Sequence, residues 1–114
     1  MIYTSYFGNY KNFPNNSYII GITRFPISGV ENCIDLSPSE KLLWQFKNKE
    51  IDEFIFKVRY LNELEQLNKK DYIKYLRELE RIYNNIIICC YEKPNEFCHR
   101  HILADWLDMD IKEL

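Results

Sequence analysis

An uninterrupted apolar run from Ile86 to Tyr91 constrains the fold of this chain more than any other feature. Its length and its β-branched residues predict a strand buried on both faces, as in the middle of a parallel sheet. A polar turn, Glu92 to Asn95, follows, and Pro94 within it cannot continue the hydrogen-bond ladder of a strand. Asn95 suits the N-cap of a helix whose first turn is Glu96 to Cys98. A strand, a short turn and a helix N-terminus are the usual location of a binding site in α/β folds.

The rest of the chain alternates between strand and helix patterns. We expect a strand over 2–7, a strand over 18–23, an irregular stretch over 29–36, a helix capped by Ser37, a helix opened by Asp52, a helix over 71–83, and then the strand and helix described above. In the helix after Asp52 the apolar residues Phe54, Val58 and Leu61 should face inward, and Leu64 and Leu67 are further candidates for the same face. The pattern predicts an α/β fold, a small layered domain with a three-to-four-stranded, mostly parallel sheet flanked by about four helices.

Length and composition set further bounds. A chain of 114 residues fits a single domain over 1–114, and its formal net charge of −2 gives no field that would attract nucleic acid or membrane. No apolar run approaches the ~20 residues that span a bilayer, and the N-terminus lacks the regions of a signal peptide. We therefore expect a cytoplasmic protein. For the same reason its four cysteines, at positions 33, 89, 90 and 98, are expected to be reduced.

Cys98 is the candidate reactive group at this corner. The helix N-terminus and the neighbouring His99 and Arg100 favour its thiolate, the form that acts as a nucleophile, a redox thiol or a metal ligand. Glu92 leaves the strand at the same corner and suits a general base. The structural alternative is that Cys98 is simply a small, packed side chain and that Glu92 forms an internal salt bridge.

Two arginines are candidates for holding an anion. Arg100 lies near the helix N-terminus, where backbone N–H groups and a bidentate guanidinium both favour phosphate or carboxylate. Arg24 follows the strand over 18–23 and should emerge at the same edge if the two strands are parallel. The structural alternative pairs Arg100 with Glu92, Glu96 or Asp105.

A zinc site is another hypothesis for this corner. Cys90, Cys98, His99 and His101 offer four ligands, but their spacing lacks the paired units of structural zinc sites. His99 and His101 also diverge on a helix, because residues two apart point in different directions. We therefore predict no metal and no cofactor.

The segment Cys90-Tyr-Glu92-Lys-Pro-x-x-Phe-Cys98-His99-Arg100 resembles the signature of the domain of unknown function 488 family. Further similarities are Tyr3-Thr-Ser-Tyr-Phe-x-Asn9, Arg24-Phe-Pro26-x-Ser28 and Leu36-Ser-Pro38-Ser39. The sequence departs at Ile22, where the family often has an acidic residue. The resemblance implies a compact α/β domain of bacterial or phage origin with no assigned activity.

These observations lead to one functional expectation and one rival. The expectation is a small α/β protein that binds an anionic small molecule of the phosphate or nucleotide class, with a nucleic-acid end fitting the same chemistry. Arg24, Arg100 and His99 would hold the anion, Ser5 and Asn9 would add hydrogen bonds, and Cys98 and Glu92 would supply any reaction. The rival is a non-catalytic interaction module in which the corner is purely structural.

Overall fold

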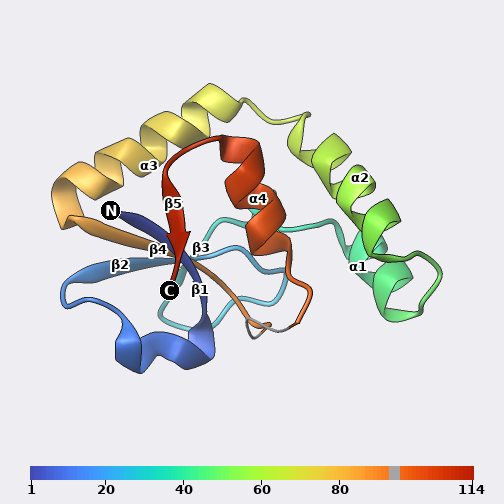
Figure 1. The fold of residues 1–114 in the computed structure, drawn as a ribbon, viewed down its shortest axis with the longest axis horizontal. Coiled ribbons are helices and arrows are strands. Elements are labelled where there is room, and N and C mark those ends of the chain that lie inside the picture. Colours follow the sequence, from blue (N-terminus) through green and yellow to red (C-terminus); the bar gives the residue numbers. More distant parts are fainter. Residues whose placement is uncertain (93–95) are drawn as a thin grey trace.

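A computed structural model describes residues 1–92 and 96–114 (Figure 1). These residues form five strands, two 3₁₀-helices and four α-helices. In order they are β1 (Ile2–Tyr6), η1 (Phe7–Asn12), β2 (Ser17–Gly21), β3 (Glu31–Asn32), η2 (Ile34–Leu36), α1 (Glu40–Lys47), α2 (Glu53–Leu64), α3 (Lys69–Tyr83), β4 (Asn85–Cys90), α4 (His99–Leu107) and β5 (Ile111–Glu113). The predicted Pro94 turn and Asn95 cap lie outside the described residues.

The strands form one sheet in the order β3-β2-β4-β1-β5, and every pairing is parallel. The α/β class is therefore confirmed, and the sheet has five strands where three to four were predicted. The two strands that were not located from the sequence, β3 and β5, lie at the edges of the sheet. β3 falls in the stretch expected to be irregular, and β5 is a three-residue strand at the C-terminus. Both are too short to give a periodic signal in the sequence.

β4 is the central strand, as its continuous apolar run predicted. It pairs with β2 on one side and β1 on the other, and residues Ile86 to Cys90 are all buried. Ile86, Ile88 and Cys90 pack into the main core with residues of all four α-helices. Cys89 is also fully buried, but it alternates to the opposite face of the sheet. Figure 1 shows α3 and α4 above the sheet and η1 below it.

The helices α1, α2 and α3 start at residues whose side chains cap them, with some shifts from the predicted positions. Ser39, two residues after the predicted cap Ser37, caps α1 by accepting a hydrogen bond from the backbone N–H of Leu42. Asp52 caps α2 as expected. The inner face predicted for α2 was wrong for Phe54 and Val58, whereas Leu64 is buried and Leu61 packs against the core, as predicted. Phe54 is 70% exposed, and the buried stripe is Phe56, Tyr60 and Leu64.

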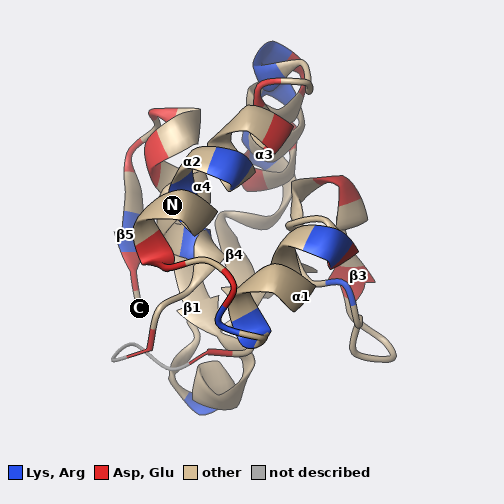
Figure 2. Cartoon of the chain, turned by 90° about the vertical axis from the view of Figure 1, so that its right-hand side faces the viewer, with Lys and Arg blue, Asp and Glu red and all other residues tan. Residues whose placement is uncertain are grey.

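Charged residues of both signs are interspersed over the helices on the side shown in Figure 2. This distribution agrees with the small formal net charge of −2. Within the described part of the chain, no helix is both long enough and apolar enough to cross a membrane.

Candidate functional site

The candidate site lies at the carboxyl ends of β2 and β4. From β2 the chain continues outward to the edge strand β3, whereas from β4 it crosses over β1 to reach β5. The two connections therefore leave neighbouring strands in opposite directions, which is the topology that opens a crevice in parallel α/β sheets. Cys90 is the last residue of β4, and α4 begins at His99. This is the corner that the sequence predicted.

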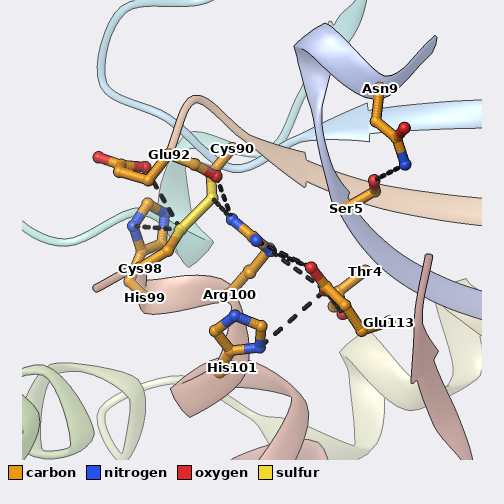
Figure 3. Close-up of polar contacts among 10 residues, drawn as sticks. All are labelled: Thr4, Ser5, Asn9, Cys90, Glu92, Cys98, His99, Arg100, His101 and Glu113. Carbon is orange, nitrogen blue, oxygen red and sulfur yellow. Dashed lines mark hydrogen bonds and ion pairs between the residues drawn. A yellow bond between two sulfur atoms is a disulfide. The ribbon is translucent and has the colours of Figure 1, made fainter. Parts of the chain in front are cut away.

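Cys90 and Cys98 form a disulfide, with their sulfur atoms 2.09 Å apart (Figure 3). The expectation of four reduced cysteines was therefore wrong for this pair, while Cys33 and Cys89 are free. That expectation was based on the expected compartment and on Cys89 and Cys90 lying in one strand, and not on the eight-residue separation of Cys90 and Cys98. Cys98 is the N-cap of α4, so the helix starts later than predicted, after Cys98 and not at Glu96.

The side chains of Glu92 and His99 both approach the sulfur atom of Cys98. An Oε2 atom of Glu92 lies 3.3 Å from Cys98 Sγ, and His99 Nδ1 lies 4.0 Å from it. His99 Nε2 lies 2.6 Å from the carbonyl oxygen of Ile22, the residue directly after β2. Because a carbonyl only accepts, Nε2 carries the hydrogen and the lone pair of Nδ1 faces the cysteines. Burial lowers the pKa of His99 to about 4, and the nearby Arg100 charge adds to this effect, so the imidazole is neutral at physiological pH.

Arg100 is entirely buried beside this cluster. Its Nη2 atom lies 2.8 Å from Glu113 Oε2, and its Nε atom lies 3.2 Å from both carboxylate oxygens. Nη1 donates to the carbonyl of Glu92 at 2.6 Å and to Cys90 Sγ at 3.0 Å. Arg100 thus ties β5 to the end of β4. The ion-pair partner is Glu113, which was not among the partners considered from the sequence.

The Glu113 carboxylate is held by several groups. Burial acts to raise its pKa, but hydrogen bonds from Arg100 and Thr4, together with the Arg100 charge, outweigh this and lower the pKa below its usual value. Thr4 Oγ1 donates to Glu113 Oε1 at 2.6 Å. His101 is half-exposed, with Nδ1 4.0 Å from the same carboxylate and directed away from the cysteines.

Three predicted ligand-binding residues lie outside this cluster. Ser5 pairs in register with Cys89, so its side chain is on the sheet face opposite Cys90. There it accepts a hydrogen bond from Asn9 Nδ2 at 3.2 Å. Arg24 is half-buried, and its Nε donates to the carbonyl of Pro38 at 3.0 Å. The structure therefore joins Cys98, Glu92, His99 and Arg100, and it does not bring Ser5 or Asn9 to them (Figure 3).

Two residues of the cluster, Cys90 and Glu113, were not predicted from the sequence as site residues. Cys90 appeared only as a rejected zinc ligand, although it begins the motif that contains Glu92 and Cys98. Glu113 had no usable signal, because nothing in a three-residue strand at the chain end indicates that it returns beside α4.

A family model described as "Active DUF488-N3 subclade" matches residues 2–110. Neither the comparison with curated proteins nor the comparison with solved structures gave a match.

Proposed function

The chain belongs to the DUF488 family, in the subclade whose description calls it active, and we propose that its 90–100 corner is a thiol-containing site for an anionic small molecule of the phosphate or nucleotide class. The observation that carries this proposal is the convergence of Cys90, Glu92, Cys98 and His99 at the carboxyl end of the central parallel strand. Ligand atoms of these four residues all lie within 4.8 Å of one another. A thiol beside a carboxylate and a neutral imidazole is the arrangement of a nucleophile with candidate bases, which is why this corner is the candidate reactive site.

Cys98 supplies the thiol in this proposal once the disulfide has been reduced. Glu92 Oε2, at 3.3 Å, is within reach to take the proton of the thiol. His99 Nδ1, at 4.0 Å, offers a second acceptor on the same sulfur. The helix position adds to this, because the N-terminus of α4 favours negative charge on its N-cap residue.

The anion would bind where α4 begins. Among the described residues, no side chain caps the first turn of α4, whereas Ser39, Asp52 and Asn68 cap the other three α-helices. The backbone N–H groups of this turn therefore suit an anionic ligand. Arg24 would supply the positive charge, since it follows Ile22, whose carbonyl binds His99. Arg100 would act indirectly, because its guanidinium already contacts Glu113, Glu92 and Cys90.

The test combines ligand binding with thiol reactivity on reduced protein. Inorganic phosphate and a nucleoside monophosphate should raise the melting temperature, the uncharged nucleoside should not, and Arg24→Ala should remove the shift. Iodoacetamide should label Cys98 quickly even at a pH below the ordinary thiol pKa of about 8.5. Bound phosphate should slow this labelling. If neither anion shifts the melting temperature and Cys98 does not react, the corner is structural, and the hypothesis of a non-catalytic interaction module replaces the hypothesis of an anion-binding thiol site.

A further inference from the structure

We propose that the same four side chains form a site for a thiophilic divalent metal ion, zinc above all, when Cys90 and Cys98 are reduced, and that the disulfide is the metal-free state. The ligands would be Cys90 Sγ, Cys98 Sγ, His99 Nδ1 and a carboxylate oxygen of Glu92. This inference does not depend on anion binding or on a reaction of Cys98.

The donor set matches the chemistry of zinc. Two thiolates, one imidazole and one carboxylate are all common zinc ligands, and four of them complete a tetrahedron. In a tetrahedral site with standard bond lengths, donor atoms are separated by roughly 3.3–3.8 Å. The observed separations from Cys98 Sγ, 3.3 Å to Glu92 Oε2 and 4.0 Å to His99 Nδ1, are close to that range. The prediction of no metal was based on the missing paired ligand units and on the divergence of His99 and His101, and in the structure Glu92 takes the place of His101.

His99 is oriented as a metal-ligating histidine. Its Nε2–H donates to the backbone carbonyl of Ile22 at 2.6 Å, which leaves the Nδ1 lone pair directed at the cysteines (Figure 3). Such a hydrogen bond on the far nitrogen fixes the tautomer and the ring plane of most histidine ligands. The side chain is also buried, at 6% exposed, so the imidazole is held in place by the core.

The surroundings also suit a metal–thiolate centre. Arg100 Nη1 donates to Cys90 Sγ at 3.0 Å, and this contact would stabilise a thiolate there. Cys90, Cys98 and His99 are buried and Glu92 is half-buried, so three of the four ligands are shielded from solvent. The Cα atoms of Cys90 and Cys98 are 7.4 Å apart, a distance that leaves room for one ion between the two sulfur atoms.

Metal binding and the disulfide exclude each other, because both use the same two sulfur atoms. Two equivalents of a small thiol R–SH reduce the disulfide to two cysteine thiols and form R–S–S–R. The two thiols then lose two protons as they bind the divalent ion. An oxidising thiol–disulfide environment reverses both steps and releases the metal, so the site would be loaded only under reducing conditions.

The experiment is a Co²⁺ titration of the full chain after reduction, followed by Zn²⁺ competition. Reduced wild-type protein should show a thiolate-to-cobalt charge-transfer band and tetrahedral d–d bands that saturate at one equivalent, and Zn²⁺ should abolish both. The oxidised protein should show neither band. Cys33→Ser is the matched control, since Cys33 is free and outside the cluster, and it should behave as wild type.

Two variants assign the ligands. Cys98→Ser should lose about half of the charge-transfer intensity and bind at least tenfold more weakly. Glu92→Gln should keep the charge-transfer band and shift the d–d bands. Circular dichroism checks that each variant is folded. If Cys98→Ser is unfolded, an alkylation experiment on wild type replaces that variant: one equivalent of Zn²⁺ should protect Cys90 and Cys98 from the alkylating reagent. Reduced, folded wild type with no cobalt band and no zinc protection would overturn the proposal, while leaving phosphate binding and Cys98 labelling to be judged separately.

Discussion

The buried ion pair between Arg100 and Glu113 gives the sharpest test of how the corner is held together. Glu113→Gln keeps the size of the side chain but removes the charge that compensates a fully buried guanidinium. Removing one partner of a buried pair costs about 3–5 kcal/mol, and we expect about 3 kcal/mol here, because Glu113 is 31% exposed and water can partly replace it. For a domain of this size that corresponds to a fall of about 12 °C in melting temperature.

A second ion pair supplies the control. Arg81 and Glu78 are also 2.8 Å apart, but their side chains are 72% and 56% exposed. Glu78→Gln should therefore leave the melting temperature unchanged within error, because solvent screens the pair. Both variants are measured by urea unfolding and thermal melts at neutral pH. If Glu113→Gln costs less than about 1 kcal/mol, or if the two variants behave alike, burial is not what gives the Arg100 pair its strength.

Three further outcomes follow from the structure. The pKa of Glu113 is lower in the folded than in the unfolded protein, so its carboxylate should contribute fully to the free energy of unfolding at pH values above its unfolded pKa of about 4.3. This contribution should be lost as the pH falls through the folded pKa, so the urea-unfolding curves of wild type and Glu113→Gln should converge in acid. Burial raises the pKa of Cys89 to about 12, so in native protein iodoacetamide should label the half-buried Cys33 and spare Cys89, and equal labelling would contradict the assigned burial. Ser39→Ala should cost about 1 kcal/mol in urea unfolding through loss of the α1 cap, and an unchanged midpoint would show that Ser37 caps the helix instead.

The candidate site was located from local pattern because its parts are close together in sequence. An apolar run, a turn and an amphipathic segment specify a strand–helix corner within about twenty residues, and in an α/β sheet such corners carry sites. Cys98, Glu92 and His99 were found for that reason. The role of Arg100 was not settled, because its partner Glu113 belongs to a short edge strand whose position depends on the whole sheet.

The α2 helix shows the same limit in the core. Two stripes, Phe54 with Val58 and Phe56 with Tyr60, have the same spacing of four residues, so periodicity alone supports both equally. The packing partners decide between them. Phe56 lies against Phe46 of α1, and the Tyr60 hydroxyl donates to the buried carbonyl of Leu36 at 2.5 Å.

The amino-acid sequence by itself determined the α/β class, the central strand β4 and the corner at its end, because strand burial and helix capping are encoded by neighbouring residues. The tertiary structure alone decided that Cys90 meets Cys98, that His99 turns its Nδ1 toward them, and that Arg100 is neutralised by Glu113. Each of these contacts depends on the distance between elements that pack together only once the sheet has formed, and no local periodicity carries that distance.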